Sequence, residues 1–272
     1  MSIPPFLCEH TNATAKRNGF RFICGTCGSY WDLDSRQETV AYDQTYPAQR
    51  GHFDPRVGAL KVRTLRRWLE VGRVKLDGKH VCEVGFGGGT CLPFLADRAR
   101  RVLGLEANAA TIEHARQAGY GADLLLVQAL PPRLDEPVDL WIFQDSFEHI
   151  PDPASFVTWM RHNSTPSSEI LLVAPRADSL SQRIMGRLWP HKLPDHQFQW
   201  SRAGLVEFMG RRGFALRADF FPLKFASPQM VVAHFLHKAG APDSVRKWLG
   251  GAAFALPINF GELGLVFQRR AA

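Results

Sequence analysis

The sequence is poor in cysteine and contains no long apolar run. Five cysteines occur in 272 residues, an odd number that argues against a disulfide framework. No uninterrupted apolar stretch reaches the roughly 18 residues that a membrane-spanning helix requires; the best candidate, residues 249–268, is broken by Pro257, Asn259 and Glu262. The N-terminus also lacks the basic segment followed by an apolar stretch that marks a secretion signal. We therefore expect reduced thiols, no membrane partner and a cytoplasmic location.

Acidic residues are outnumbered by basic ones. The chain has 33 lysines and arginines against 26 aspartates and glutamates, a net charge of +7. The basic residues are scattered in short groups, which favours a solvated surface over a nucleic-acid-binding one. Hydrophobic residues make up 45% and charged residues 22%, so wholesale disorder and fibrous folds are excluded. The length fits one large domain, or one domain with a small appendage.

Residues 1–35 carry three of the five cysteines at a spacing that suits a metal ion. Cys8-x-His10 is followed by Cys24-x-x-Cys27, and two pairs of soft ligands on tight turns can close a tetrahedron around zinc. A segment this short cannot build a core, so the metal would supply its folding energy. We predict a structural zinc site at Cys8, His10, Cys24 and Cys27; the alternative is a tail with incidental cysteines. Four protein ligands leave no open position for a catalytic zinc.

Residues 36–76 connect this segment to the rest of the chain. Their second half has apolar side chains at helical spacing, at Val62, Leu65, Trp68 and Leu69, which predicts a helix. Aromatic and histidine side chains precede that helix, and they either pack against the domain edge or fold over a ligand. We therefore interpret this stretch as a helical bridge or lid.

From residue 77 to residue 272, short apolar runs alternate with helical patterns. Seven runs predict strands, at residues 80–85, 101–106, 123–128, 138–144, 169–174, 214–220 and 262–268. The helical patterns cover residues 90–99, 109–118 and 154–162. Near-continuous apolar strands that alternate with helices indicate a parallel sheet covered on both faces. We predict an α/β fold with a doubly wound, seven-stranded, mostly parallel sheet, and cap insertions near 177–200 and 221–260.

The first predicted strand leads directly into a glycine-rich loop that starts at Glu83 and continues through Gly85, Gly87 and Gly89 to Thr90. In such sheets, ligands bind beyond the carboxyl ends of the strands, where this loop lies. The dinucleotide fingerprint requires glycine at the first, third and sixth positions, and the sixth position here is Thr90. An acidic residue two positions before the first glycine instead fits a ligand with a cationic amino group.

At these residues the sequence resembles the small-molecule branch of the class I S-adenosylmethionine-dependent methyltransferases. The matching motifs are the loop at Glu83, Glu106 after the second strand, and the segment 144–153 after the fourth. The resemblance spans roughly residues 77–220 and implies a Rossmann-like methyltransferase fold with S-adenosyl-L-methionine as cofactor. The cofactor-binding residues that it implies are Glu83, Gly85, Phe86, Gly87, Gly89, Glu106, Ala107, Gln128, Ala129, Gln144 and Asp145.

The resemblance also implies a role for each of these elements. The glycine loop would wrap the methionine and ribose of the cofactor, and Glu106 would hold both ribose hydroxyls, since a carboxylate has two acceptor oxygens. Gln128 and Ala129 would border the adenine, although Gln128 departs from the aspartate often found at that position. Segment 144–153 would form the floor of the methyl-transfer pocket.

Two histidines are candidate catalytic residues. His149 follows the fourth strand, and His196 lies between the fifth strand and a helix, where this family inserts a substrate-facing cap. A hydroxyl acceptor needs a base near the transferred methyl, and histidine has a suitable pKa. Each histidine is alternatively a structural, hydrogen-bonded residue, and an amine or already deprotonated acceptor needs no base.

We expect methyl transfer to the oxygen of a small molecule, with a sugar or secondary-metabolite intermediate as an acceptor class. An RNA- or nucleic-acid-directed methyltransferase is one alternative. Against it, the sequence Gln-Asp-Ser-Phe at 144–147 stands where base-methylating enzymes commonly carry an Asn/Asp-Pro-Pro-aromatic run. A second alternative is a catalytically silent cofactor-binding scaffold. The sequence does not define the oligomeric state.

Overall fold

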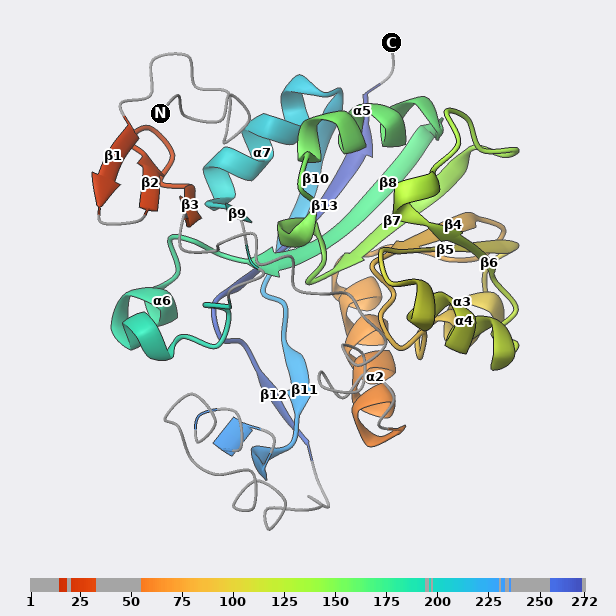
Figure 1. Ribbon diagram of the computed structural model, residues 1–272, viewed down its shortest axis with the longest axis horizontal. Coiled ribbons are helices and arrows are strands. Elements are labelled where there is room, and N and C mark those ends of the chain that lie inside the picture. Colours follow the sequence, from red (N-terminus) through yellow and green to blue (C-terminus); the bar gives the residue numbers. More distant parts are fainter. Residues whose placement is uncertain are drawn as a thin grey trace.

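The structure is a computed structural model, and it describes residues 15–18, 21–32, 55–193, 196, 198–229, 231–232, 235 and 255–270. Figure 1 shows a large central sheet flanked by helices, with a smaller sheet on one side. No helix in the described part of the chain is both long and apolar enough to span a lipid bilayer.

The central sheet has seven strands in the order β10-β13-β8-β7-β4-β5-β6. Their bounds are β4 (His80–Val84), β5 (Arg101–Glu106), β6 (Asp123–Leu126), β7 (Val138–Gln144), β8 (Ser164–Pro175), β10 (Phe214–Phe220) and β13 (Glu262–Arg269). The strands β6, β5, β4, β7 and β8 are parallel, whereas β13 is antiparallel to both of its neighbours. The predicted seven-stranded, mostly parallel α/β sheet is confirmed.

Helices cover both faces of this sheet (Figure 1). One face carries α2 (Pro55–Val71), α3 (Leu92–Ala96) and α4 (Ala109–Gln117), and the other carries α5 (Pro153–His162) and α7 (Arg202–Arg211). Side chains cap three of these helices at their first turns: Asn108 on α4, Asp152 on α5 and Ser201 on α7. The helix predicted at 90–99 is shorter than expected, because the chain leaves α3 at Asp97 and Ala99 then bridges to Asp77.

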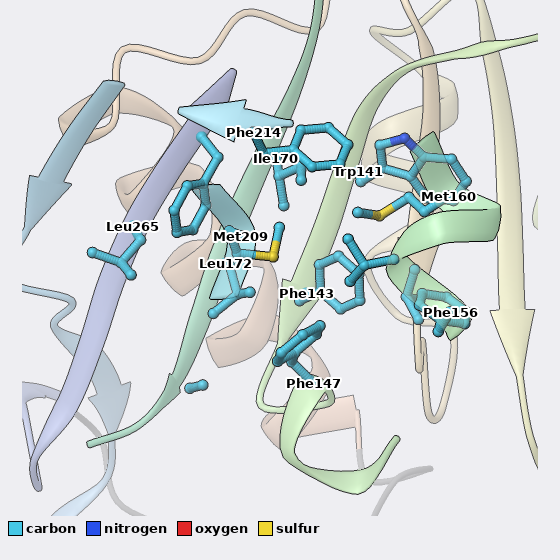
Figure 2. Close-up of a cluster of buried hydrophobic side chains, with 14 of the residues drawn as sticks. Trp141, Phe143, Phe147, Phe156, Met160, Ile170, Leu172, Met209, Phe214 and Leu265 are labelled. Carbon is cyan, nitrogen blue, oxygen red and sulfur yellow. The ribbon is translucent and has the colours of Figure 1, made fainter. Parts of the chain in front are cut away.

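The core between the sheet and helices α5 and α7 is built from large aromatic and aliphatic side chains. Figure 2 shows Trp141 and Phe143 from β7 beside Met160 and Phe156 from α5. Trp141, Phe143 and Met160 are completely buried, and full burial of one such side chain stabilises the fold by roughly 1.5–3 kcal/mol. This core fixes the carboxyl ends of the parallel strands, where the candidate site lies.

A second, four-stranded sheet joins the N-terminal segment to the large cap insertion. Its order is β1-β2-β3-β9, with bounds Ala15–Asn18, Arg21–Cys24, Tyr30–Asp32 and Phe198–Gln199. Strand β3 pairs antiparallel with β9, and the Ser29 hydroxyl accepts a hydrogen bond from the backbone N–H of Ser201 at 3.0 Å. The N-terminal strands therefore contact the chain immediately after His196.

The two insertions predicted as caps contain short elements. Between β8 and β9 lie α6 (Leu180–Met185) and a 3₁₀ turn (Gly186–Leu188). Between β10 and β13, the strands β11 (Lys224–Ala226) and β12 (Leu256–Ile258) form an antiparallel pair. Figure 1 shows α6 and the β11–β12 pair on the side of the sheet where β7 and β8 end.

Candidate active site

The glycine-rich loop leaves β4 in a conformation that only glycine adopts without strain. Gly85 has φ +71°, and its N–H donates to the carbonyl of Leu105 at 2.7 Å. A Cβ atom at Gly85 would lie 2.6 Å from the Cβ of Ser146, far inside van der Waals contact. Phe86 is buried and its ring lies against Gly104 of β5. The loop is therefore fixed closely against the ends of β5 and β7.

Glu83 is the buried carboxylate at the start of this loop. Its Oε1 accepts a hydrogen bond of 2.6 Å from the Gln144 side chain, while its Oε2 is buried and has no hydrogen-bond partner among the described residues. Burial raises the pKa of Glu83 to about 7, although the Gln144 hydrogen bond and the charge of Lys61 lower it. A buried acceptor of this kind is suited to a cationic donor.

Glu106 ends β5 and binds the backbone on both sides of the site. Its Oε2 accepts from the N–H of Gly87 at 2.9 Å, and its Oε1 accepts from those of Ala107 and Asn108 at 2.7 and 3.1 Å. Burial raises the pKa of Glu106, whereas the hydrogen bonds from these three backbone N–H groups lower it. A carboxylate offers about four acceptor positions, so Oε2 can take a further donor.

Gln128 and Ala129 lie in a 3₁₀ turn (Val127–Ala129) that directly follows β6. The Gln128 amide donates to the carbonyl of Ala107 at 3.1 Å, which connects the turn to the end of β5. The structure therefore brings the ends of β4, β5, β6 and β7 together, as the sequence predicts for the cofactor-binding set.

Asp145 belongs to a network of ion pairs with Lys224 and Glu262 that no sequence pattern predicted. It has φ +51°, unusual for a residue with a side chain, and its Oδ2 pairs with Lys224 of β11 at 2.6 Å. The same ammonium contacts Oε1 of Glu262 at 2.8 Å. Burial alone would lower the pKa of Lys224, but the two carboxylates outweigh it and raise that pKa. No local pattern marked Lys224 or Glu262, because they meet Asp145 only through the fold.

The predicted histidines lie side by side. The ring centroids of His149 and His196 are 4.6 Å apart in a T-shaped contact, and Nε2 of His196 lies 3.9 Å from a carboxylate oxygen of Glu148. The ligand atoms of these three residues lie within 4.8 Å of one another. Glu148 and His196 are both buried, with 1% and 5% of their surfaces exposed, and we assign no ion to this group.

A third histidine, His191, was not singled out from the sequence. Its Nε2 lies 2.8 Å from Oε1 of Glu262, and its ring centroid is 6.4 Å from that of His196. Three histidines and two acidic side chains therefore gather beyond the ends of β7 and β8.

Half of the predicted zinc ligands can be placed. Cys24 is buried at the end of β2, and Cys27 follows in the adjoining turn, where its thiol donates to the Ser29 hydroxyl at 3.3 Å. Cys8 and His10 lie outside the described residues. No disulfide joins the four cysteines within the described part of the chain. The zinc site stays a prediction.

Curated relatives match part of this chain. A protein of Mycolicibacterium smegmatis named "Probable S-adenosylmethionine-dependent methyltransferase" is 32% identical over 141 residues, 50% of this chain and 52% of that protein. A ubiquinone biosynthesis O-methyltransferase of Pseudomonas fluorescens is 30% identical over 96 residues, 33% of this chain and 41% of that protein. The matched stretch thus spans only about half of these relatives or less.

Solved structures share the fold at low sequence identity. Magnesium protoporphyrin IX methyltransferase from Synechocystis, with bound S-adenosylhomocysteine, superposes with a TM-score of 0.50 at 18% identity, covering 79% of this chain and 84% of the other. An S-adenosylmethionine-dependent methyltransferase from Aquifex aeolicus gives a TM-score of 0.52 at 10% identity, covering 84% and 98%. The sequence model of one family, described as "Methyltransferase domain", matches residues 57–218. This chain belongs to that methyltransferase family.

Proposed function

We propose that this protein transfers the methyl group of S-adenosylmethionine to a hydroxyl oxygen of a small-molecule acceptor. The observation that carries the proposal is the pair of carboxylates at the glycine loop. Glu83 keeps one buried oxygen without a partner among the described residues, and Glu106 keeps acceptor capacity at the end of the neighbouring strand. One carboxylate suits the ammonium group of the cofactor's methionine, and the other suits a ribose hydroxyl.

The proposed cofactor contacts follow the ends of four parallel strands. Gly85, Gly87 and Gly89 supply a cradle without Cβ atoms, Phe86 between them is buried, and a Cβ at Gly85 would clash with Ser146. Gln144 holds the Glu83 carboxylate at 2.6 Å. The remaining proposed contacts are Ala107 at the end of β5, Gln128 and Ala129 next to the adenine, and Asp145 at the end of β7. The prediction that Glu106 holds both ribose hydroxyls stays a prediction.

When bound, the cofactor supplies an electrophilic methyl group on a sulfonium. The residues of the chain then have to position the acceptor in line with that methyl and keep water away, and positioning of this kind contributes on the order of 7–11 kcal/mol. A hydroxyl acceptor must also lose its proton. His149 and His196 remain candidate bases, since they lie together beside the end of β7.

The acceptor class is a small molecule with a reactive hydroxyl. Relatives named for O-methylation in ubiquinone biosynthesis support an aromatic hydroxyl, and a sugar or secondary-metabolite intermediate is the class expected from the sequence. Nucleic acid is the second candidate, motivated by the net charge of +7 and by the predicted zinc-binding segment, which could contact nucleic acid. A gel shift with generic tRNA at rising salt concentration distinguishes the two.

Calorimetry with S-adenosylhomocysteine tests the proposal. We expect binding by the wild-type chain and a loss of affinity of at least about tenfold in Glu106→Gln, because a charged hydrogen bond contributes about 1.5–3 kcal/mol. Glu113→Gln, an exposed carboxylate on α4, is the matched control and should bind like the wild type. Absence of binding by the wild type would refute the proposal and favour a scaffold without the cofactor.

The N-terminal cysteines form a separate part of the proposal. We expect one structural zinc per chain, held by Cys8, His10, Cys24 and Cys27. Elemental analysis of the purified protein measures the zinc content directly, and Cys27→Ser should lower it. A metal-free wild-type protein would refute the site.

A further inference from the structure

His191 has the arrangement of a base held by a carboxylate. It follows the turn after α6 in the cap insertion, and its ring packs against Trp189 with centroids 5.2 Å apart. Its Nε2 lies 2.8 Å from Oε1 of Glu262, and 12% of its side chain is exposed. Glu262 itself is 1% exposed, so the anchor is buried while the histidine ring keeps an accessible edge.

The surroundings of Glu262 determine which nitrogen of His191 carries the proton. Lys224 contacts the same Oε1 at 2.8 Å, and the N–H of Phe260 donates to Oε2 at 2.8 Å. Burial opposes ionisation of Glu262, but these partners outweigh it and lower its pKa. An ionised carboxylate only accepts hydrogen bonds, so Nε2 of His191 must be the donor. In the neutral ring, Nδ1 is therefore unprotonated.

Nδ1 of His191 forms no hydrogen bond within the described part of the chain, so its lone pair is available to a proton donor. The titratable and charged groups next to the ring are Glu262 from β13, with Lys224 from β11 behind it, and His196. The tautomer thus leaves Nδ1 as a basic nitrogen, while Nε2–H is held by the buried Glu262 carboxylate.

A chain of contacts connects His191 to the proposed cofactor site. Lys224 binds Glu262 and also Asp145, which directly follows the end of β7. The neighbouring Gln144 holds Glu83 at the glycine loop. His191 consequently lies at the same edge of the sheet as the cofactor contacts, on the side of the cap insertions.

Of the two histidines predicted from the sequence, His196 has an environment unlike that of His191. His196 is 5% exposed, and its Nδ1 lies 3.3 Å from the amide nitrogen of Gln199. An amide N–H that donates to Nδ1 engages the lone pair that a base would use. The geometry therefore favours His191 as the proton acceptor and a structural role for His196.

We propose that His191 is the general base of the methyl transfer, with Glu262 as its positioning residue. This inference rests on the proposed function. As the acceptor oxygen forms its bond to the methyl carbon, its O–H proton moves to Nδ1 of His191. The carbon–sulfur bond breaks, and its electron pair stays on sulfur, which becomes a neutral thioether. The resulting imidazolium is stabilised by the Glu262 carboxylate and returns its proton to solvent.

Nitrogen-15 NMR on the full chain tests the protonation state without any acceptor. His191→Gln assigns the signal, and in the neutral ring we expect hydrogen on Nε2 and an unprotonated Nδ1. In Glu262→Gln, a side-chain amide can donate as well as accept, so the neutral Nδ1–H tautomer should appear. A wild-type neutral ring with hydrogen on Nδ1 and none on Nε2 would overturn the proposal.

Turnover with two probe acceptors tests the chemical role. Catechol keeps its hydroxyl protons at neutral pH, whereas 4-nitrocatechol is already ionised there. His191→Gln retains a donor for Glu262 but removes the base, so kcat with catechol should fall by about 10²–10⁴-fold with an unchanged KM for the cofactor. The loss with 4-nitrocatechol should be much smaller. His162→Gln, an exposed histidine at the end of α5, is the matched control.

The outcomes separate this inference from the proposed function. Equal losses of kcat with both probes, or wild-type turnover in His191→Gln, would overturn the base assignment. S-adenosylhomocysteine binding in the wild type and in His191→Gln, measured by calorimetry, reports on the proposed function alone. If the wild type methylates neither probe, catechol and 4-nitrocatechol are excluded as acceptors and the tautomer of His191 decides the assignment.

Discussion

Replacement of Glu83 by glutamine tests whether this buried carboxylate receives the ammonium group of the cofactor. In the ligand-free protein, burial raises the pKa of Glu83 to about 7, so the carboxyl is largely protonated slightly below neutral pH. An ammonium group placed beside it would favour the carboxylate and lower that pKa again. Binding at pH 6.5 should therefore release about three quarters of a proton from Glu83.

Calorimetry of S-adenosylhomocysteine in buffers of different ionisation enthalpy measures this release. The α-amino group of the ligand, with a reference pKa of about 7.7–8.0, is already charged at pH 6.5 and contributes little. Glu83→Gln keeps a hydrogen-bonding oxygen for Gln144 but cannot ionise. Its proton release should be near zero, and its affinity should fall about 10- to 150-fold, since a charged hydrogen bond contributes about 1.5–3 kcal/mol.

The Glu83→Gln substitution should also stabilise the folded protein at pH values above the raised pKa of Glu83. A carboxyl whose pKa rises from 4.5 to about 7 on folding destabilises the folded state above that pH, by roughly 3 kcal/mol for a shift of this size. Without ligand, Glu83→Gln should therefore resist urea better than the wild type at pH 8.5, and the difference should vanish at pH 4. Equal proton release by both proteins, or wild-type affinity in the variant, would refute the reasoning.

Three further substitutions, one of them with a matched control, probe the scaffold by urea denaturation. Gly85→Ala places an alanine at φ +71° and creates a severe clash, so it should lower the free energy of unfolding by about 2–4 kcal/mol. Gly78→Ala has the same φ but lies in open space, so its loss should be roughly 1–2 kcal/mol. Equal losses in the two variants would exclude the clash. Leu172→Ala, at a completely buried position, should cost about 2–5 kcal/mol, and a loss below this range would mean that the core repacks. Lys224→Met should lower the free energy of unfolding by about 3 kcal/mol at pH 7. Because the ion pair lowers the pKa of Glu262, this loss of stability should shrink as the pH falls below about 4.3. A loss that does not depend on pH would contradict the ion pairing.

The sequence predicted the central strands well because β4, β5, β7 and the second half of β8 are nearly continuous apolar runs buried on both faces. The predicted ends of the strands were less accurate where polar residues continue a strand. Strand β8 begins at Ser164 instead of residue 169, since Ser168 donates to the carbonyl of Val138 and extends the pairing. Strand β6 ends at Leu126, because the chain turns at Val127 into a 3₁₀ helix.

The cofactor side of the site follows contiguous motifs, so the sequence could indicate Glu83, Glu106 and Gln144. The proposed acceptor side depends on long-range contacts instead. Lys224 meets Asp145 from a separate cap strand, and Glu262 reaches His191 across 71 positions of the chain. Only the tertiary fold shows which histidine is held by a carboxylate, and no spacing in the sequence encodes it.

The pairing of β3 with β9 has a consequence for the order of events during translation. Ser29 and Ser201, which hydrogen-bond beside this pair, are 172 positions apart. At a synthesis rate of about 5–20 residues per second, β3 waits roughly 9–34 s for its partner strand. During that interval its outer backbone groups are open to any other unpaired strand. The nascent N-terminal strands are thus a point at which this chain is open to wrong strand pairing until β9 has been synthesised.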